Sequence, residues 1–175
     1  MKLKEITSTI TDYVANGSFK SLKENAYYVN PEKGYARVIR LTDFNNSFDS
    51  KDTVWVDKNG YDFLKKSSLQ HNDIIISNVG AYLGTVFLAP ELNVPMTLGP
   101  NAILIRPNNK VINLYLYYAL LSNAGFSKIM AIKSGSAMPK FNKTDLKEID
   151  FNIHSIKEQQ HIVDTVCQSS LSNIT

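Results

Sequence analysis

Short runs of hydrophobic residues, separated by polar and turn-forming residues, recur along the chain and predict β-strands. β-branched and aromatic residues, which are typical of strands, are concentrated in 37–44, 52–56, 73–80, 84–90 and 101–107. The first run leads into a turn at 43–46, where Asp43 is expected to hold the turn. The glycine-bounded stretch GAYLG joins the third and fourth runs, and Pro107 ends the last.

Helical patterns follow the strands. The stretch 58–69 predicts one or two helical turns, and 113–123 (NLYLYYALLSN) is apolar on every face, which predicts a buried helix with Asn113 as its N-cap. This order of elements predicts an α+β fold. We expect a twisted, mostly antiparallel sheet with a buried helix, followed by a C-terminal exit helix.

The C-terminal part of the pattern raises a question about domain organisation. Residues 143–147 predict a short polar helix, and Ile149, Phe151 and Ile153 alternate as in a strand. A further helix then begins near Ser155 without a glycine or proline break. We therefore expect one domain over 1–154 and, over 155–175, the start of a helix that leaves it. The alternative is a helix that folds back on the sheet.

Composition limits the class of protein. A chain of 175 residues, 43% hydrophobic and 20% charged, favours one domain with a real core. No apolar run approaches the roughly 20 residues that cross a bilayer, and the N-terminus lacks the apolar region of a secretory signal. Cys167 is the only cysteine, which excludes a disulfide scaffold. Together these features predict a cytoplasmic protein.

The charge is mildly basic, with 19 Lys and Arg against 16 Asp and Glu, a net charge of +3. Its distribution is more informative, because the segment 127–143 contains no acidic residue and four lysines: Lys128, Lys133, Lys140 and Lys143. Such a basic strip can contact phosphates. The alternative interpretation is an ordinary solvated loop with lysines.

Motifs for catalysis are missing from the sequence. There is no glycine-rich nucleotide loop, and the three histidines form no metal-ligand pattern. Asp73 is the best candidate for the centre of a small metal-dependent nuclease, but no carboxylate cluster accompanies it. The sequence therefore predicts a binding protein without metal or cofactor. A protein- or sugar-binding module, with Tyr27, Tyr28 and Tyr35 as surface aromatics, is a further alternative.

The order of motifs resembles that of a known family. VANGSFKSLKEN, YARVIRLTDF, LQHNDIIISNVGAYLG, the Tyr/Leu helix and IKSGSAMPKFNKTDLKEIDFNIHSIKEQQHIV are similar, in this order, to the target recognition domain of type I restriction–modification specificity subunits. Glu158 and Gln159 match the Glu-Gln pair of that family. Asn72 stands where the family has glycine, and His154-Ser155-Ile156 replaces its Pro-Pro-Leu step.

The resemblance implies a non-catalytic DNA-binding subunit without a cofactor. Such a subunit reads one half of a bipartite double-stranded DNA target, and it positions methyltransferase and restriction (translocase) subunits. The DNA-facing loops of the family map onto Ser18, Lys20, Lys23, Asn78, Tyr82, Ser134, Ser136, Lys140, Asn142 and Lys143. The final helix would serve as a spacer and pairing helix, with assembly residues Ile156, Glu158, Gln159, Val163 and Val166.

Overall fold

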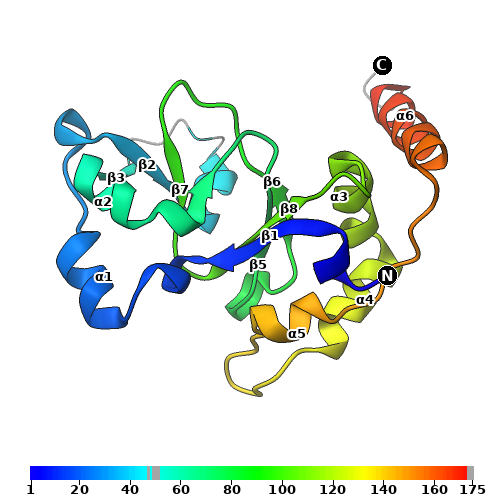
Figure 1. Ribbon diagram of the computed structural model, residues 1–175, viewed down its shortest axis with the longest axis horizontal. Helices are drawn as coiled ribbons and strands as arrows, with labels where there is room; N and C mark the ends of the chain where they lie inside the picture. The colour runs from blue at the N-terminus through cyan, green and yellow to red at the C-terminus, as the bar shows by residue number, and fades with distance from the viewer. Residues whose placement is uncertain (47, 49–51, 173–175) are drawn as a thin grey trace.

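Two four-stranded sheets form the framework of the fold (Figure 1). The computed structural model describes residues 1–46, 48 and 52–172. The first sheet is antiparallel throughout, in the order β1 (Thr7–Asp12), β8 (Ala102–Pro107), β5 (Ile74–Ser77) and β6 (Val86–Leu88). The second has the order β3 (Val54–Val56), β2 (Ala36–Ile39), β7 (Met96–Leu98) and β4 (Ser68–Leu69), and its β2–β7 pair is parallel. The α+β class is as predicted, although two mostly antiparallel sheets replace the single one expected.

The helices are divided between the two sheets. α1 (Phe19–Asn25) and α2 (Lys58–Phe63) lie with the second sheet. The first sheet is accompanied by α3 (Asn113–Leu121), α4 (Asn123–Ala131), α5 (Lys143–Lys147) and α6 (Ile156–Ser172), the last of which ends away from the body of the domain (Figure 1). None of the helices within the described residues is long and apolar enough to span a membrane.

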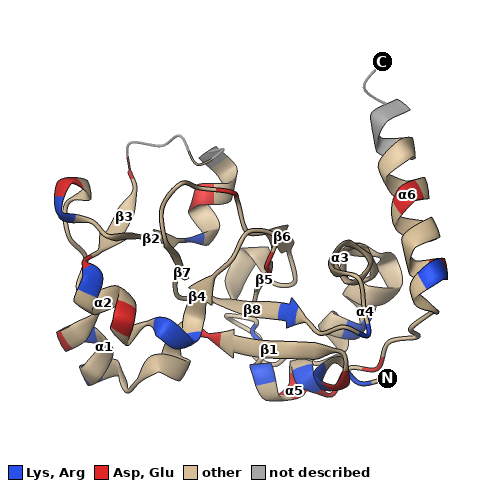
Figure 2. Cartoon of the chain, turned by 45° about the horizontal axis from the view of Figure 1, so that its top comes forward, with Lys and Arg blue, Asp and Glu red and all other residues tan. Residues whose placement is uncertain are grey.

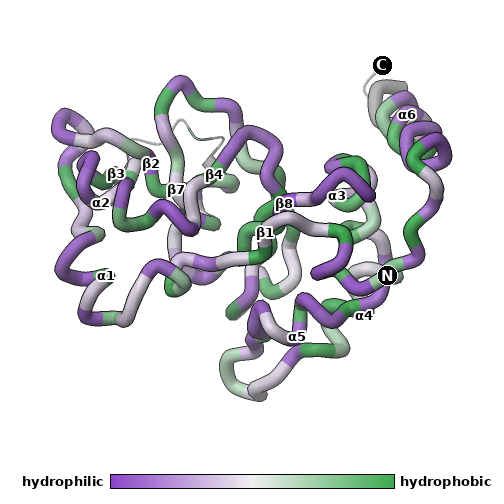
Figure 3. The backbone as a smooth tube through the Cα atoms, viewed as in Figure 1, coloured by the Kyte–Doolittle hydropathy of each residue, from purple (hydrophilic) through white to green (hydrophobic). Residues whose placement is uncertain are grey.

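The two central strands of the first sheet are buried on both faces. In β5, Ile74 and Ile76 belong to a core cluster shared with α3, whereas Ile75 faces a second cluster shared with β2 and β7. In β8, Ile105 and Leu104 are divided between the clusters in the same way. This double burial explains why both strands read as unbroken apolar runs, and Figure 3 shows the hydrophobic residues gathered along them.

Two local expectations were wrong. Residues 149–153 form no strand: Phe151 donates a hydrogen bond to the Met1 carbonyl (2.8 Å), and the segment bridges to the N-terminus at Asp150 only. Asn113 is not the N-cap of α3. Ile112 occupies that position, and the Asn113 amide donates to the Asn72 carbonyl (2.6 Å). α3 is the buried helix that was expected: Tyr115, Leu116 and Leu120 are buried, and only Leu121 at its end is exposed, at 45%.

Candidate nucleic-acid interface

Four loops from distant parts of the sequence meet on one side of the molecule, along the lower edge of Figure 1. They are residues 13–23, 78–84, 99–101 and 134–143, and together they are called the loop face below. Backbone hydrogen bonds join three of them: Asn78 donates to the Asn101 carbonyl (3.3 Å), and Phe141 donates to the Asn78 carbonyl (3.1 Å). These three loops are therefore fixed to one another through their backbones, which leaves side chains at their tips available for contact.

The surface of the loop face is concave. A hollow of about 440 Å³ is lined mostly by apolar and aromatic side chains, among them Phe19, Tyr27 and Tyr28. A second hollow of about 250 Å³ lies between Asn78 and Lys140, and a third of about 540 Å³ is lined by Arg40, Tyr82, Met138 and others. Pro100 borders all three hollows, so they form one continuous surface.

The first predicted stretch surrounds the start of α1. The Ser18 side chain caps the helix by accepting a hydrogen bond from the Ser21 backbone (3.2 Å), so its hydroxyl has a structural role. Lys20 is highly exposed and pairs loosely with Glu24, at 3.9 Å. Lys23 is exposed and lines the aromatic hollow. Of the three predicted residues, Lys23 is thus best placed to meet a ligand.

The second stretch supplies a structural residue and an exposed aromatic. The Asn78 amide donates to the Phe141 carbonyl (3.2 Å), which ties the loop before α5 to the end of β5. Tyr82 is 52% exposed and lines the third hollow. Asn78 therefore organises the loop face, whereas Tyr82 presents a side chain on it.

The third stretch is a closed loop. Ser134 and Lys140 exchange backbone hydrogen bonds of 2.8 and 2.9 Å, and Gly135 adopts φ +80°, which suits glycine. The closed backbone presents Ser136 and Lys140 to solvent. Asn142 caps α5 by accepting a hydrogen bond from the Asp145 backbone (2.8 Å), so its side-chain oxygen is engaged within the fold.

Only some of the lysines in the basic strip predicted at 127–143 are free to contact a phosphate. The Lys143 ammonium pairs with Asp12 at 2.7 Å, and Lys128 lies over the Phe151 ring while it donates to the Asp150 carbonyl. Lys133 and Lys140 are exposed, and neither forms an ion pair within the described residues. α4 also occupies the first part of this segment. Figure 2 shows basic and acidic residues mixed over the rest of the domain.

The candidate nuclease centre is an internal ion pair. Asp73 is 4% exposed, and both of its oxygens accept hydrogen bonds from Arg106, at 2.7 and 2.6 Å. These bonds raise the pKa of Arg106 above its ordinary value. In the described part of the chain, no group of three or more His, Cys, Asp or Glu residues could hold a metal ion. Asp43 likewise holds its turn, as expected, by accepting from the Arg40 backbone (2.7 Å).

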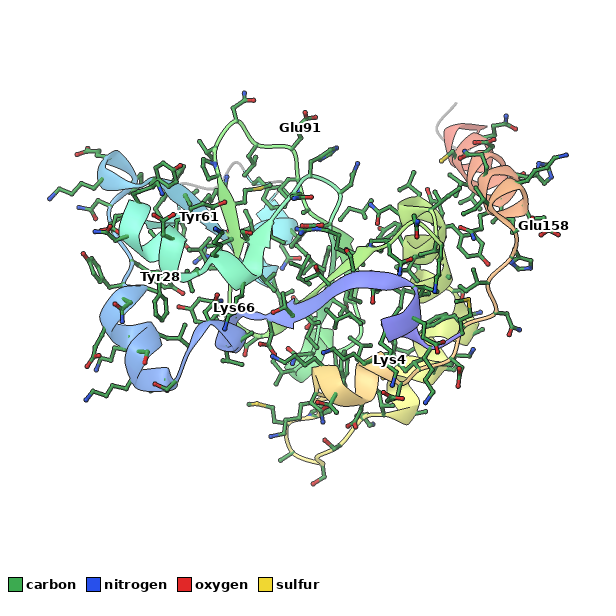
Figure 4. The ribbon with its side chains drawn as sticks, viewed as in Figure 1. Lys4, Tyr28, Tyr61, Lys66, Glu91 and Glu158 are labelled. Atoms are coloured by element: carbon green, nitrogen blue, oxygen red, sulfur yellow. The ribbon has the colours of Figure 1, made fainter. Side chains whose placement is uncertain are left out.

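The predicted assembly residues fall into two groups. Glu158 and Ser155 form a capping box at the start of α6, and their hydrogen bonds lower the pKa of Glu158; its exposed position is seen in Figure 4. Gln159 is fully buried, and Val163 is 4% exposed in the core cluster around α3. Ile156 is 49% exposed and Val166 is half-buried. The first two turns of α6, residues 156–163, are called its root below. The root therefore packs on its own domain, and Val163 is used within that contact.

Several prominent residues of the loop face were missed from sequence. Val14 is 62% exposed, Phe19 86% and Met138 66%, and all three line its hollows. Asn101 lines the second and third hollows in a turn after β7. The Gly-Pro-Asn sequence at 99–101 is a turn signal, and it could have marked this loop. The three apolar residues had no such signal, because their exposure depends on tertiary packing.

The sequence of the chain matches a known family. The family model of the type I restriction modification DNA specificity domain matches residues 3–173, so the chain belongs to that family. It is a DNA specificity domain of type I restriction–modification systems. No curated protein matches the chain.

Solved structures agree in fold. The HsdS subunit from Thermoanaerobacter tengcongensis is similar with a TM-score of 0.62 at 17% identity, over 98% of this chain and 37% of that one. The S subunit of a type I restriction–modification system from M. genitalium gives a TM-score of 0.54 at 18% identity, over 99% of this chain and 39% of that one. The chain thus spans less than half the length of either subunit.

Proposed function

We propose that this chain recognises one half of a bipartite double-stranded DNA sequence and holds it for methyltransferase subunits, together with the restriction subunit of the complex. Membership of the DNA specificity family supports the proposal. The observation that carries it is the meeting of four loops in one concave face with Lys23 and Lys140 exposed on it. A protein with this task acts in the cytoplasm, together with the DNA.

Recognition would combine phosphate contacts, which set the position of the DNA, with base contacts, which read its sequence. Lys23 lies on α1 and Lys140 in the closed loop, and both ammonium groups are exposed. This suits contacts to phosphates, which set position without reading sequence. Further candidates for DNA contact, assigned by the family resemblance, are Lys20, Tyr82 and Ser136. Ser18, Asn78, Asn142 and Lys143 would act indirectly, by fixing the loops that carry the contact residues.

The chain itself would carry out no bond chemistry. Asp73, the best nuclease candidate, is engaged by Arg106 and buried, which supports a structural role. Methyl transfer and DNA cleavage would belong to the partner subunits. A chain of this kind needs no cofactor, and its contribution to the reaction is the choice of DNA site.

The last helix would connect recognition to assembly. α6 has 17 residues, so its length is about 25 Å. Its root is anchored to the domain by Gln159 and Val163, which fixes the direction in which it leaves. We propose that the exposed part of α6 spaces this domain from a second recognition domain, docks the methyltransferase, and pairs weakly with a second copy.

The salt dependence of DNA affinity tests the proposal. Changing Lys23 and Lys140 together to alanine should weaken binding to all duplexes, because two phosphate contacts and their released counterions are lost. The slope of log affinity against log salt should fall by about two units. Lys157→Ala, an exposed lysine on α6, is the matched control and should leave the slope unchanged. An unchanged slope in the double variant would contradict the proposed phosphate contacts.

A further inference from the structure

The turn between β7 and β8 occupies the centre of the loop face. Pro100 borders all three hollows and Asn101 borders two of them. The turn also connects the two sheets, because β7 belongs to one and β8 to the other. If the loop face binds DNA, as proposed above, the duplex that covers it would pass over this turn.

The backbone of the turn is held on both sides. Gly99 donates to the Ile39 carbonyl (2.8 Å), and a Cβ atom at Gly99 would lie 2.9 Å from that oxygen, so the chain passes too close for another residue. On the other side, the Asn101 carbonyl accepts from Asn78 (3.3 Å), and Ala102 begins β8. The backbone that carries the Asn101 side chain is therefore held in place on both sides.

Asn101 combines an unusual backbone with an exposed amide. Its φ is +68°, a conformation that costs most residues about 1 kcal/mol or more and that glycine adopts freely. The side chain is exposed and makes no hydrogen bond within the described residues. The amide thus gives the fold no hydrogen bond, and glycine would suit the backbone better.

Asn72 shows the contrast within the same molecule. It also has a positive φ, +66°, and lies at the opposite end of β5, away from the loop face. Asn72 is half-buried and its carbonyl accepts from Asn113 (2.6 Å). The two asparagines share a residue type and a backbone conformation but differ in location, which provides a matched pair.

We propose that Asn101 reads a base pair of the target, by hydrogen bonds from its carboxamide to an adenine in the major groove. The carboxamide places a donor and an acceptor side by side, and adenine presents the complementary N7 acceptor and N6 donor. The turn holds the backbone of Asn101 at the centre of the face. A base other than adenine at this position would leave the donor and the acceptor of the carboxamide unpaired. The inference rests on the proposed function and adds one specificity-determining residue to it.

The test is the sequence preference of the full chain for a pool of random-sequence duplexes, read by sequencing the bound fraction. Asn101→Gly keeps the backbone conformation and removes only the amide, so the variant should fold at least as well as the wild type. It should lose preference at one A·T position by about tenfold to a hundredfold, with the salt slope unchanged. Asn72→Gly should keep the full preference.

Two results would overturn the inference. A glycine variant that keeps the wild-type preference, or that weakens on all sequences equally, would mean that Asn101 does not read a base. In both cases the proposed function stands, because the wild type still binds DNA selectively. A wild-type chain that shows no preference among the duplexes would overturn both proposals together.

Discussion

The loop face and the root of α6 use polar side chains in opposite ways. On the loop face, Ser18 and Asn142 form side-chain hydrogen bonds only within their own helix starts, to Ser21 and Asp145. Side chains at the loop tips, such as Lys140, stay exposed. At the root of α6, Gln159 is fully buried and joins three backbone groups from two other segments of the chain. Changes at the tips should therefore alter binding with little effect on stability, whereas changes at the root should do the reverse.

Among the polar side chains of these two regions, Gln159 has the largest expected effect on stability. Its Oε1 accepts from Ile112 (2.8 Å), and its Nε2 donates to the carbonyls of Lys110 (3.2 Å) and His154 (2.9 Å). Gln159→Ala would leave these backbone groups unpaired in a buried site, at a cost of about 2–4 kcal/mol in the free energy of unfolding. Urea unfolding measures the change.

The neighbouring Gln160 provides the control for this experiment. Gln160 is exposed and bonds only to Asp164 on the same helix (2.8 Å), so Gln160→Ala should change the free energy of unfolding by less than about 0.5 kcal/mol. Equal stabilities for the two alanine variants would mean that the root of α6 is not anchored as described, and the contrast with the loop face would fail.

A smaller effect is expected for self-association through α6. Ile156 is 49% exposed, so Ile156→Asp together with Val166→Asp should remove weak pairing of the chain while the domain stays folded. Light scattering over a concentration series, with urea unfolding in parallel, measures both properties. Val163→Asp is the contrasting variant, because Val163 is 4% exposed in the core, and its substitution should unfold the domain. Unchanged pairing in the double variant would place the interface elsewhere.

The smallest expected effect is a pH dependence of the free energy of unfolding, which arises from an exposed ion pair outside both regions. Hydrogen bonds from Lys2 and Lys4 lower the pKa of the Glu148 carboxyl to about 2, from its ordinary value of 4.5. The folded state therefore binds this proton more weakly than the unfolded state does. The stabilisation is present above about pH 4.5 and is lost as the pH falls towards 2.

The measurement is the urea midpoint of the wild type and of Glu148→Gln across that range. The difference between them should shrink as the pH falls. It should be absent throughout when Lys2 and Lys4 are both alanine, because the partners that lower the pKa are gone. A difference that is constant with pH would contradict the assignment of this shift to the two lysines.

The sequence determined those elements whose signal is local. The apolar runs at 73–80 and 101–107 predicted β5 and β8, since strands buried on both faces must be apolar at successive positions. The polar start at Lys143 predicted α5, and the residues after Ser155 predicted α6. The order of motifs also indicated the family, which the match over 3–173 confirms.

Only the tertiary structure decided the elements and the site that depend on distant partners. β1 reads as the polar sequence TSTITD and becomes a strand because it pairs with β8, where Ile10 lies opposite Ile105. The burial of Gln159 and the central place of Asn101 follow in the same way from segments far away in the chain. Local propensity acts over a few residues, whereas these contacts arise only when the sheets assemble. The sequence therefore predicted elements with a local signal, and the fold decided which side chains of the loops between them face outward.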